Sequence, residues 1–274
     1  MTPRLFGKKI VFYPHTKIEF PQVSMTENQG IVWRLIPLLS CPGHLQMAID
    51  EWLLEEHRHH RHPPALRFYT WHPAAISLGY HQRHYPSAWH DLQWQGQPLD
   101  LVRRPTGGRA VLHQGDLTYM VVTSGLQGHR LATYAKICEF LIQGWKSLGI
   151  DLNYGSAQAT RNHHPNCFNL ATGADLVLAN GFKLIGSAQL HRDGAILQHG
   201  SMRLVPDGDL LTQVFGADQE EVEFPLTPLP APSEIIAALT EAACDCFQIQ
   251  LQSQPFSESE WASILARVSN TNSV

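Results

Sequence analysis

The densest group of side chains with chemical potential lies at residues 103–113, which read RRPTGGRAVLH. Three arginines, a glycine pair and a histidine follow the apolar run Leu99–Val102. Glycine lets the backbone turn tightly or approach a ligand without a Cβ in the way. Backbone N–H groups at such a turn can also bind an anion. A glycine pair between two strands is equally typical of a plain hairpin turn, so the spacing leaves both interpretations open.

Two other residues have side chains suited to group transfer. Cys167 lies in the Asn- and His-rich stretch 153–173, and Lys183 follows the turn Asn180–Gly181. A cysteine beside a basic group has its pKa lowered and becomes a thiolate nucleophile. A lysine near a carbonyl oxygen stabilises the developing oxyanion. The pair suits acyl transfer through a thioester, but an inert buried cysteine and a surface lysine remain the alternative.

Metal binding is less well supported by the sequence. The run at 57–62, HRHHRH, contains metal-ligand types, but its arginines repel a cation and favour a solvated helix end. Cys244 and Cys246 would project about 200° apart on a helix, which makes them poor co-ligands. We therefore expect no metal and no cofactor.

Composition restricts the class of protein. The chain has 274 residues, is 43% hydrophobic and carries a net charge of −4, which gives no basic balance for nucleic acid or a membrane surface. Its five irregularly spaced cysteines do not form a disulfide framework and indicate a reducing compartment. No apolar run approaches the ~18 residues of a membrane span, and residues 1–30 lack the apolar centre of a secretory signal. We expect a cytoplasmic protein.

Strands and helices are predicted to alternate around one main sheet. Residues Leu45, Ala48, Ile49, Trp52 and Leu53 recur at helical spacing after Pro42, with Asp50 and Glu51 on or beside the polar face. Residues 81–98 are expected to form a loop. Strands are expected at 10–13, 31–39, 66–71, 75–78, 110–112, 117–122, 174–179, 182–185 and 195–202. Further helices are expected at 131–145, at 233–247 and after the capping box that Ser257 begins.

This pattern predicts an α+β fold with a mixed sheet flanked by helices and a short helical C-terminal tail. Residues 1–30 are interpreted as an N-terminal extension, and Met25 offers an alternative translation start. Residues 31–223 are predicted to form the catalytic domain. Residues 224–274 are predicted to be a Pro-rich connector and C-terminal helices that pack on that domain.

Several motifs carry a family resemblance. The segments 103–113 and 117–119 (LTY), together with 180–189 (NGFKLIGSAQ) and 194–201 (GAILQHGS), resemble the signature of the lipoate–protein ligase and octanoyltransferase family. The helix segment 47–51 (MAIDE) looks like the family's first helix. The resemblance covers roughly residues 31 to 265, and motifs in the same order are far more specific than a lone glycine-rich turn.

The resemblance implies a biotin/lipoate protein ligase-like sheet, related to the catalytic domains of class II synthetases. It implies that Lys183 contacts the acyl carbonyl and that the turn at 106–110 wraps the acyl group. Cys167 and Lys183 are then the expected catalytic residues. The expected substrate-binding residues are Arg104, Thr106, Gly107, Gly108, Arg109, Ala110, His113, Gly186, Ser187, Ala188, His199 and Gly200.

Within the family, two chemistries compete. ATP-dependent ligases form an acyl-adenylate and usually have a third glycine where this chain has Arg109. The cysteine-dependent octanoyltransferases take the acyl group from acyl carrier protein, and Cys167-Phe168 resembles their nucleophile and its neighbour. Met120, where serine is common, and the unusual spacer 169–173 depart from the pattern.

The resemblance therefore favours an octanoyltransferase. Its donor would be octanoyl-acyl carrier protein, and its acceptor a lysine of a lipoyl-carrier protein such as the glycine-cleavage H protein. The alternatives are an ATP-dependent lipoate–protein ligase, an amidotransferase between lipoyl domains and, from another class, a non-catalytic acyl- or carrier-binding module. His113 and His199 are the candidates for the base that deprotonates the acceptor amine.

Overall fold

The computed structural model describes residues 4–5, 8–9, 31–155, 175–216 and 228–271. Two short strands, β1 (Arg4–Leu5) and β2 (Lys8–Lys9), pair antiparallel near the N-terminus. The strand expected at 10–13 and the expected nucleophile Cys167 lie outside the described residues.

The main sheet of the described chain is mixed, as predicted, and its strand order is β11-β12-β13-β14-β10-β4-β3-β15. The pairs β15–β3 and β3–β4 are parallel, and the other neighbours are antiparallel. Its strands are β3 (Ile31–Cys41), β4 (Ala65–Trp71), β10 (Asp116–Ser124), β11 (Asn153–Tyr154), β12 (Leu176–Val177), β13 (Lys183–Arg192), β14 (Ala195–Arg203) and β15 (Ile249–Ser253).

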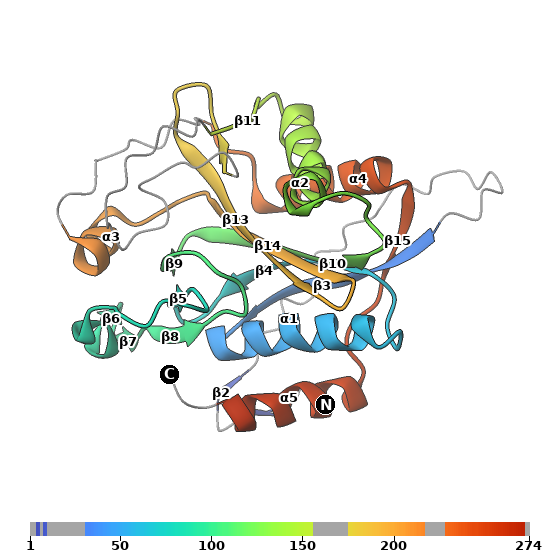
Figure 1. Cartoon of the computed structure of the whole chain (residues 1–274). Coiled ribbons are helices and arrows are strands. Elements are labelled where there is room, and N and C mark those ends of the chain that lie inside the picture. The colour runs from blue at the N-terminus through green and yellow to red at the C-terminus, as the bar shows by residue number, and fades with distance from the viewer. Residues whose placement is uncertain (1–3, 6–7, 10–30, 156–174, 217–227, 272–274) are drawn as a thin grey trace.

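Helices cover both faces of this sheet (Figure 1). On one face lie α1 (Gly43–Arg58) and α5 (Glu258–Thr271), and α1 lies between the sheet and α5. On the other face lie α2 (Arg130–Ser147) and α4 (Pro232–Phe247). Each face buries its own apolar core, because the alternation of side chains along a strand sends successive residues to opposite faces.

A smaller unit extends from one end of the main sheet (Figure 1). Its three strands are β8 (Asp100–Arg103), β5 (Ala75–Leu78) and β9 (Val111–His113), in that order. The helix α3 (Gly208–Phe215) packs on it through an apolar cluster. The remaining pieces are the 3₁₀ helix η1 (Ser87–Asp91) and the strands β6 (Gln93–Trp94) and β7 (Gln97–Pro98).

This small sheet changes the interpretation of the glycine-rich segment. A hairpin turn would pair β8 with β9, but the two strands lie on opposite edges of β5, one parallel and one antiparallel to it. Residues 104–110 therefore cross over the end of β5, and the strands expected at 110–112 and 117–122 are present as β9 and β10. The alternative of a plain hairpin turn is excluded by the same pairing.

Other local expectations also need correction. Residues 81–98 contain η1 and the hairpin β6–β7, where a loop was expected. Between the two C-terminal helices, β15 joins the main sheet at its edge beside β3, a strand that the sequence analysis missed. Asp50 is fully buried although its helix position predicted the polar face, because α1 is covered by the sheet on one side and by α5 on the other.

The end of α1 also differs from expectation. The helix stops at Arg58, and His57 is buried, so the histidine run is not wholly a solvated helix end. His57 Nε2 contacts the Ser124 hydroxyl at 3.0 Å, and His62 contacts both Arg34 and Glu260. In the described part of the chain, no group of three His, Cys, Asp or Glu residues is arranged to hold a metal ion. None of its helices is long and apolar enough to cross a membrane.

Candidate active site

The glycine-rich segment is held over the end of β5 by its own second arginine. The buried Arg104 guanidinium donates from Nη1 to the Ser77 carbonyl oxygen at 2.8 Å and from Nη2 to the Gly107 and Arg109 carbonyls at 2.9 and 2.6 Å. The Tyr80 N–H donates to the Thr106 carbonyl at 2.8 Å. Arg104 thus fixes the shape of the crossing segment, in addition to any contact it makes with substrate.

The two glycines of this segment have different physical requirements. Gly108 has a φ of +102°, a left-handed conformation, and a Cβ there would lie 2.7 Å from the Arg104 side chain. Gly107 has no positive φ, and a Cβ there would meet no atom of the described residues within 4 Å. Folding therefore requires glycine at 108, whereas the open space beside Gly107 is free for a ligand.

A buried hydrogen-bonded chain connects helix α1 to this segment through His199. His199 Nδ1 donates to Asp50 Oδ2 at 2.8 Å, and His199 Nε2 pairs with the Thr106 hydroxyl at 2.7 Å. Asp50 also accepts from Arg67 Nε at 2.9 Å and from the Tyr69 hydroxyl at 3.0 Å. Its carboxylate is therefore paired with a buried cation as well as with the imidazole.

A second chain of the same kind passes through His113. His113 Nδ1 donates to Asp116 Oδ2 at 2.8 Å, and His113 Nε2 lies 2.8 Å from the Ser77 hydroxyl. Burial lowers the pKa of His113, although Asp116 opposes the shift, so the ring is neutral near pH 7 and Nε2 accepts from Ser77. The Ser201 and Thr118 hydroxyls also donate to Asp116, at 2.6 and 3.2 Å.

Lys183 lies at the start of β13, directly after the predicted Asn180–Gly181 turn. The hairpin is confirmed by the pairing of Val177 with Lys183 and by the hydrogen bond from the Gly181 N–H to the Leu178 carbonyl. Both Lys183 and Asp175 are buried, and their Nζ and Oδ2 atoms lie 2.9 Å apart. A buried ammonium is retained only with such a partner, because desolvation would otherwise be too costly.

The next residues of β13 lie against β14. Gly186, Ser187 and Ala188 pair with Ser201, Gly200 and His199 in register, so these expected site residues are gathered in two neighbouring strands. A Cβ on Gly200 would lie 2.4 Å from Ser187 Oγ, so glycine at 200 makes room for Ser187. Ser187 Oγ in turn accepts from the Tyr119 hydroxyl at 2.8 Å.

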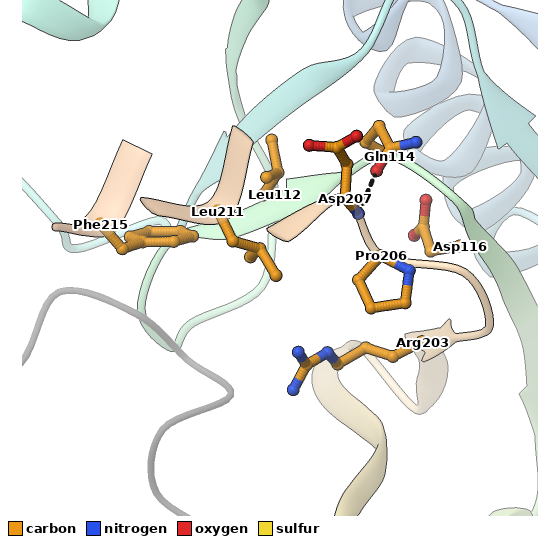
Figure 2. A pocket seen from close by; sticks show the side chains of 8 residues that line it. All are labelled: Leu112, Gln114, Asp116, Arg203, Pro206, Asp207, Leu211 and Phe215. Carbon is orange, nitrogen blue, oxygen red and sulfur yellow. Dashed lines mark hydrogen bonds between the residues drawn. The ribbon is translucent and has the colours of Figure 1, made fainter. Parts of the chain in front are cut away.

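A small cavity lies behind Asp116 (Figure 2). It holds about 10 Å³, room for one water molecule, and lies between the β9–β10 turn, the end of β14 and α3. Arg203, which pairs across the sheet with Asp116, contributes its side chain to the wall, and burial lowers its pKa to about 10. The lining residues are Leu112, Gln114, Asp116, Arg203, Pro206, Asp207, Leu211 and Phe215.

Three carboxylates organise this region, and none of them was predicted as a site residue from the sequence. Asp175 could have been found from the hairpin, since it lies just before the strand that pairs with Lys183. Asp116 follows His113 at a spacing of three residues. Asp50 had no comparable local signal, because its partners Arg67 and His199 come from distant strands.

The sequence of this chain matches the profile of a known protein family. A family profile described as the lipoyl protein ligase A/B catalytic domain matches residues 42–241, a range that contains all four predicted motif regions. The chain belongs to this family, and the predicted resemblance is confirmed.

Individual relatives are similar to the chain over most of their length. Octanoyltransferase LipM of Anoxybacillus flavithermus is 37% identical over 204 residues, which cover 70% of this chain and 72% of that protein. Octanoyltransferase LipM of Symbiobacterium thermophilum is 41% identical over 187 residues, covering 65% and 68%.

Solved structures show the same fold. A putative lipoate protein ligase of T. acidophilum with bound lipoic acid has a TM-score of 0.70 at 24% identity and covers 86% of this chain and 95% of that one. Lipoate-protein ligase A bound with ATP has a TM-score of 0.66 at 23% identity, covering 86% and 94%. The expected α+β, ligase-like architecture is confirmed.

Proposed function

We propose that the protein transfers an octanoyl group from acyl carrier protein to a lysine of a lipoyl-carrier protein, such as the glycine-cleavage H protein, through a thioester on Cys167. Membership of the lipoyl protein ligase A/B family and the similarity to octanoyltransferases support octanoyl transfer in protein lipoylation. The donor, the acceptor and the covalent intermediate are parts of the proposal.

The observation that carries the choice of nucleophile concerns the other cysteines. The chain has five, and in each of the four that the structure describes the pKa is raised by burial. The pKa of Cys41 and of Cys138 rises to about 12, so neither thiol ionises near neutral pH. A thiolate is the reactive form, so the raised pKa of the described thiols supports Cys167, the nucleophile that the family resemblance implies.

In the first step, the Cys167 thiolate attacks the octanoyl thioester carbonyl. The new carbon–sulfur bond forms as the carbonyl double bond opens to an oxyanion. When the carbonyl re-forms, the bond to the carrier sulfur breaks, and the carrier leaves as a thiolate that takes up a proton. Lys183, held as a buried cation by Asp175, stabilises the tetrahedral oxyanion. The segment Thr106–Ala110 positions the acyl group, with the open side of Gly107 toward it.

In the second step, the neutral ε-amine of the acceptor lysine attacks the octanoyl-Cys167 carbonyl. An amide forms, the Cys167 sulfur leaves, and the amine loses a proton. His199 is the better placed of the two candidate bases, because its Nε2 contacts Thr106 on the glycine-rich segment. The Nε2 of His113 instead contacts Ser77 on β5, outside the glycine-rich segment. The His113 ring is stacked on Trp71, with 3.8 Å between the ring centroids.

Intact-mass measurement tests the proposal. The protein is incubated with octanoyl-acyl carrier protein in the absence of ATP, and we expect one octanoyl adduct on the wild type and none on Cys167→Ala. Cys244→Ala is the matched control, because it removes a partly exposed thiol from α4 and leaves the adduct intact. Absence of the adduct together with lipoate-dependent AMP formation would indicate a ligase, and absence of both activities a binding module.

A further inference from the structure

One loop beside the glycine-rich segment carries an arginine and two histidines and lacks acidic residues. No Asp or Glu occurs between Glu56 and Asp91 or between Asp100 and Asp116, although the whole chain has a net charge of −4. The two ranges lie side by side in the structure, because residues 79–84 contact the glycine-rich segment. We refer to residues 79–84 (GYHQRH) as the basic loop.

The basic loop is fixed to the candidate active site. Arg103 Nη1 donates to the Gly79 and Gln82 carbonyls at 2.9 and 2.7 Å. The backbones are in direct contact, since a Cβ on Gly79 would lie 1.9 Å from the Gly108 carbonyl oxygen. A protein bound to this loop is therefore held in register with the segment that positions the acyl group.

The side chains of the basic loop point to solvent. Tyr80 is 58% exposed, and His81, Arg83 and His84 are exposed beside it. No carboxylate of the described residues forms an ion pair with Arg83. Arg58 and Arg61, at the end of α1, are instead paired with Glu55 and Glu56. Within the described part of the chain, Arg83 is thus a cation without an acidic partner, next to an exposed aromatic ring of the kind enriched in interfaces.

We propose that the basic loop is the docking surface for the acidic carrier that delivers the acyl thioester, a step that rests on the proposed transferase function. A partner with a negative surface is repelled by the overall charge of this chain, so a local positive surface is needed to steer it. The donor fits better than the acceptor. A donor arm attached by a phosphodiester brings negative charge to the loop, whereas the target lysine of the acceptor brings none.

Charge reversal at Arg83 tests the docking surface. The acylation rate of Cys167 is measured with octanoyl-acyl carrier protein and with octanoyl-pantetheine, a small donor that has no phosphate and no protein. We expect Arg83→Glu to raise the KM for the carrier donor about tenfold at low salt and to leave the small donor unchanged. The wild-type KM for the carrier should rise with ionic strength, and this dependence should be weaker in the variant.

Two controls make the result specific. Lys146→Glu makes the same change of charge at an exposed residue of α2 and is expected to leave both donors unaffected. Arg83→Lys keeps the charge and is expected to restore carrier binding. Both Arg83 variants should retain the wild-type melting temperature, because the side chain is exposed.

The outcomes separate this proposal from the proposed function. If the wild type accepts an octanoyl group from neither donor, the transferase function is wrong. If it accepts both and Arg83→Glu alters neither KM, or alters both equally, the docking surface is wrong while the function stands. A variant slowed only in transfer from Cys167 to the acceptor protein would assign the loop to the acceptor and overturn the proposal.

Discussion

The two Asp–His–hydroxyl chains around the glycine-rich segment have nearly the same geometry and different surroundings. In each, a carboxylate lies 2.8 Å from Nδ1, and a hydroxyl lies 2.7 or 2.8 Å from Nε2. Asp50 is also bonded to the buried cation Arg67, whereas the hydrogen bonds recorded for Asp116 come from the imidazole and the hydroxyls of Ser201 and Thr118. The Asp–His–hydroxyl unit is therefore part of an ion-pair network at Asp50, whereas at Asp116 it lies among mainly neutral donors.

This difference predicts unequal costs when each carboxylate is removed. Asp50→Ala leaves the Arg67 guanidinium buried without its anion, and one of its nitrogens, Nη1, already has no hydrogen-bond partner among the described residues. We expect a loss of about 3–5 kcal/mol in the free energy of unfolding. Asp116→Ala leaves hydroxyl donors and a neutral imidazole without their acceptor, and we expect a loss of about 1–3 kcal/mol in the free energy of unfolding.

Urea unfolding of the two variants measures this comparison, with Asp151→Ala as an exposed control that should change stability little. Equal losses for Asp50→Ala and Asp116→Ala would mean that the buried cation finds another partner, and the distinction between the two chains would fail.

The contrast between the chains also shows how far the sequence could predict the site. The turn and the strands that carry Lys183, Gly186–Ala188 and His199–Gly200 were predicted because they depend on local sequence pattern, whereas the roles of these residues came from the family resemblance and stay predictions. The partners Asp50 and Arg67 were not, because 17 residues and a helix-to-strand connection separate them. Burial of α1 from two sides depends on α5, at the other end of the chain.

The fold follows the same division. Helices α1, α2 and α4 were predicted from apolar spacing, which is a local property. The placement of β5 between β8 and β9 depends on long-range pairing, so the glycine-rich segment resembled a hairpin turn in the sequence. The strand β15 does show alternation in Ile249–Ser253, but its partner β3 is more than two hundred residues earlier in the chain.

The pH dependence of stability tests whether His113, in the chain that contains Asp116, is neutral in the folded protein. Burial lowers the pKa of His113 in the folded protein, while the unfolded chain titrates near ~6.5. Between these two pKa values the unfolded state binds more protons, so the contribution of His113 to stability is present above pH ~6.5 and is lost as the pH falls below it. The slope for one such group is at most about 1.4 kcal/mol per pH unit.

We expect His113→Gln to reduce the acid-side slope of stability, measured from urea midpoints between pH 5 and 7. The His113→Gln variant keeps a residual slope, because burial also lowers the pKa of His57. His90→Gln, at an exposed position, should leave the slope unchanged. An unaltered slope in His113→Gln would show that folding does not lower the pKa of this imidazole and that the two chains do not differ as described.

The hydroxyl ends of the two chains provide the smallest and most specific contrast. Thr106→Val and Ser77→Ala each remove the partner of a buried imidazole Nε2, and each should cost about 1 kcal/mol of stability. Only Thr106 lies on the segment proposed to position the acyl group. Ser77 contacts this segment through Arg104, and that arginine also bonds the Ser77 carbonyl, which the substitution retains.

Single-turnover acylation of Cys167 should therefore slow about tenfold in Thr106→Val, since a small misplacement of reacting groups is costly. It should change little in Ser77→Ala, and Thr106→Ser should restore the rate because it keeps the hydroxyl. Equal slowing in Thr106→Val and Ser77→Ala would mean that both chains act only by supporting the fold.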